Sequence, residues 1–288
     1  MKLKSKSAII TGATMGFGKE AARQFLIEGA SIVICSRNLK DLENTKKELN
    51  EYIKANNQKI LIIKCDISNE VEVENLVNLT IKELGKIDIL VNNAGIYGPK
   101  GSIEDIDWSE WKKAIEINLF GPMFLCSLVI PHMKKNNNGK IINLSGGGAT
   151  NPMPKISAYA ASKAAIVRMT ETLAGECIGF NIDINSIAPG ALNTRLLEEI
   201  LESGPEKVGN HFYEKALKQK EDGGAPLSKG VDLCVFLASS ESDGISGKLI
   251  SAIWDPWENL QKNKDILNKS DIYTLRRIIP QDRNMSLE

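Results

Sequence analysis

Two side chains suited to proton chemistry, Tyr159 and Lys163, lie four residues apart in the run Tyr-Ala-Ala-Ser-Lys. On a helix, this spacing places the phenol and the ammonium group on one face. A free phenol titrates at about pH 10 and is a poor base at neutral pH, but a neighbouring ammonium group favours the phenolate and lowers its pKa. The pair therefore predicts a tyrosine that exchanges a proton with a substrate oxygen. The spacing is also common by chance, and an ordinary amphipathic helix face is the alternative.

A glycine-rich turn, Thr11–Gly18 (TGATMGFG), stands between an apolar run and a helical pattern. Glycines let a backbone turn tightly beside a pyrophosphate, and the helix that follows offers free N–H groups and the positive end of its dipole. The glycine spacing differs from the common GxGxxG, so an ordinary turn is the alternative. The position between strand and helix favours a dinucleotide site formed by Gly12, Thr14, Met15, Gly16, Phe17 and Gly18.

The end of the second apolar run, Ser36-Arg37, bears on which dinucleotide binds. An acidic residue here would bind the ribose 2′-hydroxyl of NAD, and none is present. The Arg37 guanidinium suits a 2′-phosphate instead, so NADP is favoured and NAD remains possible. A solvated surface arginine is the alternative reading of Arg37.

Small and polar residues also follow the third and fourth runs. Asp66 and Ile67 close the third, and Asp66 could accept a hydrogen bond from the adenine amine. Its alternative role is the N-cap of the next helix, which Ser68 suits better. Asn93, Ala94 and Gly95 close the fourth run. Since carboxyl ends of parallel strands share one edge, all are expected at the cofactor site.

The elements that must position these residues alternate between strand and helix. Short apolar runs lie at Ser7–Thr11, Ser31–Cys35, Ile60–Cys65, Ile87–Val91, Lys140–Leu144, Ile182–Ala188 and Lys248–Ser251. Helical patterns lie at Lys19–Glu28, Leu39–Ala55, Glu70–Leu84, Trp108–Lys135, Ala158–Ile178 and Gly230–Ser239. Continuous apolar strands indicate burial on both faces of a parallel sheet. We expect an α/β fold, a single Rossmann-type doubly wound domain with a mostly parallel seven-stranded sheet flanked by helices.

This domain is expected to cover residues 1–253. Two segments of the chain depart from the alternation of strands and helices. Pro189–Pro226 contains no strand and follows the sixth strand, where ligands bind, so a lid or substrate loop is expected. Residues 254–288 form a C-terminal extension with two tryptophans and many charges. That extension is expected to pack on the domain or on a neighbouring subunit.

Composition excludes several classes of function. Lys and Arg total 36, as do Asp and Glu, so no excess positive charge attracts nucleic acid or a membrane surface. The five cysteines are scattered singly, which indicates reduced thiols. His132 and His211 show no metal-ligand spacing, so no metal site is expected.

No targeting segment is expected either. The apolar run Ala8–Ile10 is shorter than the roughly 7–15 residues of a signal peptide. The most apolar segment, Ile115–Pro131, is interrupted by Asn118, Pro122 and Pro131 and falls short of the roughly 20 residues of a membrane helix. A cytoplasmic protein is expected.

The motifs in this order resemble the short-chain dehydrogenase/reductase family over residues 5–253. The resemblance rests on TGATMGFG (11–18), NNAG (92–95), IEINLFG (115–121), YAASK (159–163) and Pro189-Gly190 followed by Thr194. It implies a tetrad of Asn, Ser, Tyr and Lys, in which Asn118 holds a water in a proton relay with Lys163. It also implies that Lys163 holds the nicotinamide ribose, that Pro189, Gly190 and Thr194 contact the cofactor, and that the chain forms a homodimer or homotetramer through Trp108–Lys135 and Ala158–Ile178.

The serine of the tetrad is the departure from the family pattern. Most members carry it thirteen residues before the tyrosine, and that position here is Gly146. Ser145 lies one residue earlier, a spacing that some members use. The role needs a hydroxyl that donates to the substrate oxygen, so Ser145 is assigned to it.

Three functions fit these residues. The first is an NAD(P)-dependent oxidoreductase that moves a hydride between the nicotinamide and a small carbonyl or secondary alcohol, with Tyr159 as proton donor or acceptor. The second is a cofactor-binding sensor or scaffold with little turnover, which the glycine at 146 supports. A nucleotide-sugar epimerase is weaker, because such chains are usually longer. The substrate stays open among polyketides, sugars, steroids and acyl-carrier conjugates.

Overall fold

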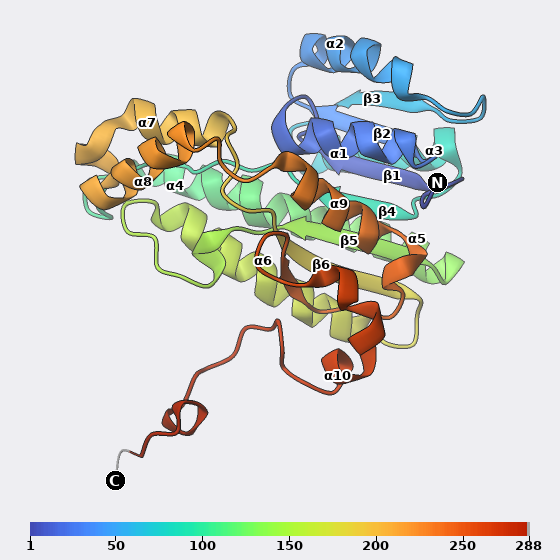
Figure 1. Cartoon of the computed structure of the whole chain (residues 1–288). Coiled ribbons are helices and arrows are strands. Elements are labelled where there is room, and N and C mark those ends of the chain that lie inside the picture. The colour runs from blue at the N-terminus through green and yellow to red at the C-terminus, as the bar shows by residue number, and fades with distance from the viewer. Residues whose placement is uncertain (287–288) are drawn as a thin grey trace.

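The fold is built on a sheet of seven parallel strands, seen in a computed structural model that describes residues 1–286. The strands are β1 (Ser7–Thr11), β2 (Ser31–Ser36), β3 (Ile60–Lys64), β4 (Ile89–Asn92), β5 (Gly139–Leu144), β6 (Ile182–Ala188) and β7 (Leu249–Ser251). They are arranged in the order β3-β2-β1-β4-β5-β6-β7 (Figure 1). The predicted Rossmann-type fold is confirmed, and the sheet is parallel throughout.

Both faces of this sheet are buried, because consecutive strand residues enter different apolar clusters. On β1, Ile9 joins one cluster and Ile10 the other. On β2, Val33 and Ile34 divide in the same way. A strand whose side chains are buried on both faces must be apolar at every position, which is the pattern that the sequence shows.

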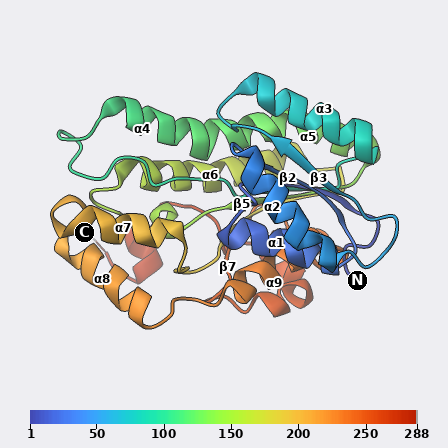
Figure 2. The same ribbon diagram turned by 90° about the horizontal axis from the view of Figure 1, so that it is seen from above.

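Helices form a layer on each face of the sheet (Figure 2). The cluster on one face includes residues from α1 (Gly16–Ile27), α2 (Leu39–Leu49) and α9 (Leu227–Ala238). The other layer contains α3 (Glu70–Leu84), α4 (Trp108–Ile115), α5 (Gly121–Asn136) and α6 (Ser157–Glu176). Helix α1 begins directly in the glycine turn, three residues earlier than predicted.

The helix predicted over Trp108–Lys135 has an interruption. A π-helical turn, Glu116–Phe120, joins α4 to α5. The stretch Trp108–Asn136 passes a length and hydropathy test for a membrane span, contrary to the expectation that its apolar run falls short. Part of its apolar surface packs in the core of the protein, since Leu125, Val129 and Met133 are fully buried in the apolar cluster on one face of the sheet.

The segment predicted as a substrate loop contains two helices, α7 (Arg195–Val208) and α8 (Asn210–Glu221). They lie together beside the strand ends, at the left of Figure 1. The base of the segment is closed, because the N–H of Ala225 donates to the carbonyl of Ala191 at 2.8 Å. We call residues 191–225 the lid.

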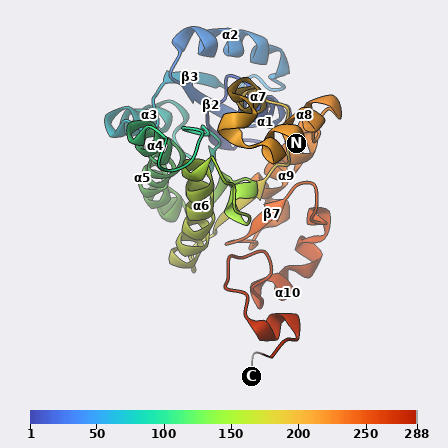
Figure 3. The same cartoon turned by 90° about the vertical axis from the view of Figure 1, so that its left-hand side faces the viewer.

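The C-terminal extension packs on its own domain up to Leu275. Trp257 and Leu267 are buried in the core, and Lys248 Nζ donates to the carbonyls of Leu267, Ser270 and Ile272 at 2.8, 3.1 and 3.0 Å. Figure 3 shows the short helix α10 (Lys264–Asn268) beyond β7, at the edge of the sheet opposite β3.

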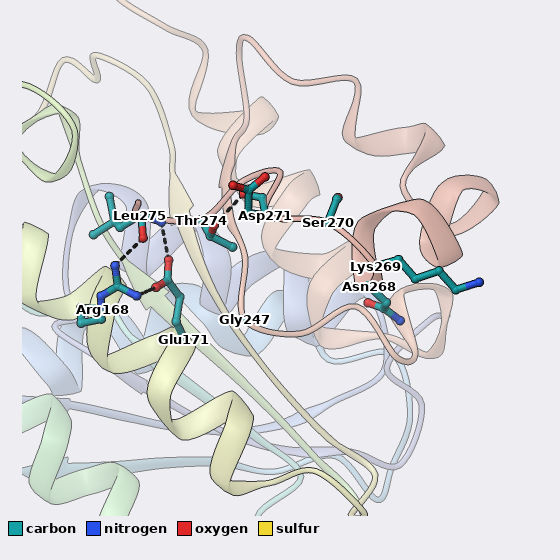
Figure 4. Close-up of a pocket in the computed structure, with 9 residues that line it drawn as sticks. All are labelled: Arg168, Glu171, Gly247, Asn268, Lys269, Ser270, Asp271, Thr274 and Leu275. Carbon is teal, nitrogen blue, oxygen red and sulfur yellow. Dashed lines mark hydrogen bonds and ion pairs between the residues drawn. The ribbon is translucent and has the colours of Figure 1, made fainter. Parts of the chain in front are cut away.

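Two residues of α6 anchor the last part of this extension (Figure 4). The N–H of Leu275 donates to Glu171 Oε1 at 2.6 Å, and Arg168 donates to the Leu275 carbonyl. Residues 276–286 then run away from the body of the protein (Figure 1).

Candidate active site

A cleft of about 1500 Å³ lies where the carboxyl ends of the strands face the lid. It gathers almost every residue that the sequence assigned to the site. The residues that line it are Gly12, Thr14, Met15, Gly16, Phe17, Ser36, Arg37, Asp66, Ile67, Asn93, Ala94, Gly95, Ser145, Tyr159, Lys163, Pro189, Gly190 and Thr194. Gly18 and Asn118 are buried outside this lining.

The glycine turn has the shape that a dinucleotide requires. Gly12 and Gly16 have φ values of +62° and +53°, which favour glycine. A Cβ at Gly18 would lie 2.4 Å from Asn93 Nδ2 and 2.6 Å from the Gly12 carbonyl. Helix α1 has no side-chain N-cap and no acidic residue in its first turn, so its N-terminal N–H groups are available to an anion. The turn therefore fits a pyrophosphate.

A hydrogen-bonded bridge, missed in the sequence analysis, holds the turn against the end of β4. Thr11 Oγ1 accepts from the backbone N–H groups of Asn93 and Ala94, both at 3.0 Å. In return, Asn93 Nδ2 donates to the carbonyls of Thr11 and Gly12 at 2.8 and 3.1 Å. A threonine that ends one buried strand and an asparagine pair that ends another were the available signal.

Asp66 and Asp41 line the cleft together with the exposed Arg37. Burial acts to raise the pKa of Asp66, but hydrogen bonds from the N–H and hydroxyl of Ser68 outweigh it and lower the pKa. The sequence analysis favoured Ser68 as the N-cap of α3, but Asn69 fills that position. The second residue, Asp41 in the first turn of α2, had no signal in the sequence pattern.

Tyr159 and Lys163 lie in the first half of α6 and both reach the cleft. Lys163 Nζ lies 5.6 Å from the centroid of the Tyr159 ring and donates to the carbonyl of Leu144 at 2.6 Å. The Tyr97 ring meets the Tyr159 ring edge to face, with centroids 4.7 Å apart. The end of β5 and the start of α6 are thus tied together at the site.

Burial dominates the ionisation of both groups. It raises the pKa of Tyr159 well above that of a free phenol, with a smaller contribution from Tyr97. It also lowers the pKa of Lys163 to about 8. Without a bound cofactor, burial therefore outweighs the expected effect of Lys163 on the pKa of Tyr159. With a pKa of about 8, Lys163 still carries its proton at neutral pH.

Asn118 lies in the π-helical turn and is hydrogen-bonded to residues next to the site. Its Nδ2 donates to the Ile96 carbonyl at 2.8 Å and to Ser162 Oγ at 3.0 Å, and its Oδ1 accepts from the Ile96 N–H at 2.9 Å. A Cβ at Gly95 would lie 3.2 Å from Asn118 Oδ1 and 3.7 Å from Lys163 Nζ. Asn118 thus fixes the loop after β4 close to the lysine.

The structure separates the two candidates for the serine position. Ser145 is 5% exposed, and its hydroxyl oxygen has no hydrogen-bond partner within the described residues. Gly146 is extended, and a Cβ added to it would lie 2.3 Å from the Tyr159 hydroxyl oxygen. Of the two positions only 145 carries a hydroxyl, and that hydroxyl is buried and oriented by no protein group within residues 1–286.

The part of the cleft beneath the lid is mainly apolar. Tyr159 belongs to a cluster of buried residues with Ile156 and the lid residues Leu197, Ile200, Val208 and Ala216. Tyr97, Met153 and Phe212 pack against this cluster and line the cleft. The proton-bearing phenol therefore faces a pocket suited to an apolar group.

A parallel Rossmann-type sheet, a glycine turn fit for a pyrophosphate and a Tyr–Lys pair in one cleft define a nicotinamide-dependent oxidoreductase. A family model described as "short chain dehydrogenase" matches residues 6–204. The chain belongs to this family of short-chain dehydrogenases/reductases and is an NAD(P)-dependent oxidoreductase that acts on small molecules.

Characterised relatives cover most of the chain. The 7alpha-hydroxysteroid dehydrogenase of Escherichia coli (strain K12) is 34% identical over 87% of this chain and 94% of its own length. The 3-oxoacyl-[acyl-carrier-protein] reductase FabG of Thermotoga maritima is 32% identical over 87% of this chain and 97% of its own. Among solved structures, levodione reductase has a TM-score of 0.79 and 26% identity, covering 90% of this chain and 99% of that one. An NAD+-bound xylitol dehydrogenase has a TM-score of 0.79 and 25% identity, covering 87% and 98%.

Proposed function

We propose that this protein reduces a ketone, or oxidises the matching secondary alcohol, with NADP as the preferred cofactor and Tyr159 as the proton donor or acceptor. The observation that carries the proposal is the shared cleft, which Tyr159 and Lys163 line together with the glycine turn. The bound cofactor supplies the hydride and, when oxidised, a positive charge. That charge favours the phenolate, which the burial of Tyr159 disfavours.

The chain's residues divide the work of binding. The N-terminal N–H groups of α1 and the glycine turn hold the pyrophosphate. Arg37 would pair with the 2′-phosphate, and Asn93–Gly95 and Thr194, which line the same cleft, would contact the cofactor toward its nicotinamide end. Asp41 also lines the cleft and disfavours a phosphate placed near it, so the preference for NADP rests on Arg37.

In the reduction direction, the O–H bond of Tyr159 breaks as the substrate oxygen gains the proton. Ser145 donates a hydrogen bond to the same oxygen and shares its developing charge. Lys163, whose pKa is lowered by burial to about 8, returns a proton toward Tyr159. Asn118 contributes by fixing the loop after β4 beside the lysine.

The substrate is proposed to be a carbonyl compound with an apolar ring or chain. The apolar cluster beneath the lid supports this, as do relatives named for a hydroxysteroid and for levodione. We further propose a cytoplasmic homodimer or homotetramer formed through α4–α6. The exposed Trp108, Phe120 and Met123 are available for that contact.

The test measures oxidation of NADPH and NADH over a panel of cyclic and aryl ketones, with the wild-type protein and Tyr159→Phe. The variant should lose about 10²–10⁴-fold in kcat, the range typical of a removed general acid, while cofactor affinity is retained. A second candidate, a cofactor-binding protein without turnover, is favoured by Gly146 at the usual serine position. Equal and negligible rates in both proteins, with NADPH still bound, would establish that candidate.

A further inference from the structure

The glycine run that follows β5 packs tightly on the start of α6. A Cβ at Gly146 would lie 2.3 Å from the Tyr159 hydroxyl oxygen and 3.3 Å from its Cζ. A Cβ at Gly148 would lie 2.8 Å from Cα of Ala160. At Gly147, between them, a Cβ would meet nothing within 4 Å. The contact is therefore specific to two alternate glycines, and the first of them faces the catalytic phenol.

The space beside Gly146 is filled by the tyrosine itself. The 2.3 Å separation is far shorter than any real contact of a Cβ, so the Tyr159 hydroxyl occupies volume that a side chain at 146 would need. No rotation of a side chain at 146 relieves this, because the Cβ position is fixed by the backbone. A serine at 146 is incompatible with this placement of the phenol.

The neighbouring hydroxyl is placed differently. Ser145 is buried, lines the cleft and has an oxygen without a protein partner within the described residues. Its backbone N–H donates to the Ile187 carbonyl at 2.8 Å, so the sheet fixes its position. The residue before it, Leu144, accepts from Lys163 at 2.6 Å. Along the chain, Ser145 thus lies between Leu144, which accepts a hydrogen bond from Lys163, and Gly146, which packs against the Tyr159 hydroxyl.

We propose that Gly146 is a positioning residue for Tyr159, and that its missing side chain moves the substrate-facing hydroxyl back one residue to Ser145. The proposal rests on the proposed function for its catalytic part. It explains why a chain with the family's tyrosine and lysine lacks a serine thirteen residues before the tyrosine. The phenol of Tyr159 lies where a side chain at 146 would begin, and Ser145 carries the nearest hydroxyl along the chain.

The first test uses stability and needs no substrate. Gly146→Ala is compared with wild type and with the same change in a Tyr159→Phe background, where the hydroxyl is gone. Overpacking costs about 1–3 kcal/mol and should lower the melting temperature Tm by about 2–12 °C in the wild type, and by clearly less beside phenylalanine. Gly147→Ala is the matched control, and its effect on Tm should be the same in both backgrounds. Equal losses from Gly146→Ala in the two backgrounds would overturn the contact.

The second test uses kinetics. Gly146→Ala should lower kcat by about 100-fold, the cost of a misplaced catalytic group, with NADPH affinity within about twofold of wild type. The double variant Ser145→Gly with Gly146→Ser moves the hydroxyl to the usual spacing. It should be no more active than Ser145→Gly alone, and activity at or above the wild-type level would overturn the proposal. A wild type without turnover on any carbonyl would refute the proposed function, while the Tm comparison would still decide the role of Gly146.

Discussion

Lys163 should destabilise the fold at neutral pH, because it is buried as a charged group without an acidic partner. Its Nζ donates to the Leu144 carbonyl, no ion pair is recorded for it within the described residues, and burial lowers its pKa from 10.5 to about 8. Each pKa unit corresponds to about 1.4 kcal/mol, so keeping this lysine protonated costs about 3 kcal/mol of folding free energy. Replacing it by methionine, which is similar in length and apolar, removes that cost.

The sign follows from proton linkage. Between about pH 8 and pH 10.5 the unfolded chain holds the Lys163 proton and the folded protein does not, so wild-type stability rises with pH over this window. Lys163→Met lacks this rise. The variant also leaves the Leu144 carbonyl without its donor, which costs about 1–2 kcal/mol at every pH. At pH 7 the variant should therefore be more stable than wild type by about 1–2 kcal/mol.

The assay is urea unfolding of both proteins at pH 7, 8, 9 and 9.5. The advantage of Lys163→Met should fall by about 2 kcal/mol between pH 8 and pH 9.5 and should reverse near the upper end. Lys47→Met, on the exposed surface of α2, is the control and should show no such trend. A stability difference that stays constant from pH 7 to pH 9.5 would refute the reasoning. Turnover by Lys163→Met should be lost throughout, so the lysine exchanges stability for catalysis.

Three further predictions concern the cofactor and the C-terminal extension. Arg37→Ala should weaken NADPH binding at least tenfold and NADH binding less than twofold, measured by fluorescence titration; equal weakening would contradict the phosphate assignment. Thr11→Val removes the acceptor for the N–H groups of Asn93 and Ala94, and should cost about 1–3 kcal/mol of stability and weaken both cofactors equally. Lys248→Met leaves three carbonyls without their donor and should make the segment after β7 susceptible to limited proteolysis; a digestion pattern like that of wild type would show that apolar packing alone holds it.

The sheet could be predicted because burial on both faces leaves a strong pattern. Val33 and Ile34 face opposite clusters, so neither position tolerates a polar residue, and the strand appears as a continuous apolar run. The placement of the cofactor residues followed from this topology, since parallel strands carry their carboxyl ends to one edge. Because each of these motifs follows a strand of the parallel sheet, the fold brings them together in one cleft.

The lid was harder to predict, because its helices bury little. Helix α8 has a single buried residue, Ala216, and α7 is broken at Gly204, where φ is +75°, just before Pro205. Glycine, proline and many charges indicate a loop when only local propensity is considered. The helices are held instead by the small cluster around Tyr159, a contact between segments far apart in the chain.

The ionisation of the Tyr–Lys pair could not be predicted from spacing. Four residues on a helix bring the two groups together, but the sign of each pKa change depends on how much water the folded chain excludes. Likewise, the spacing of motifs along the chain does not show that a side chain at 146 would clash with Tyr159, thirteen residues later. Both properties appear only once the surrounding elements are packed.

The pairing of β1 with β4 has a consequence for how the protein folds. One edge of β1 pairs with β2, but on the other edge Ala8 lies opposite Ile89, a partner some eighty residues later in the chain. Loops of this length close slowly, and contacts so distant in sequence delay folding. On the ribosome, where about 5–20 residues are added each second, one edge of β1 stays open for several seconds after β2 is made. The floor of the nucleotide cleft forms only when Asn93 arrives to bridge Thr11, so a truncated nascent chain has no place for a ligand that could stabilise it.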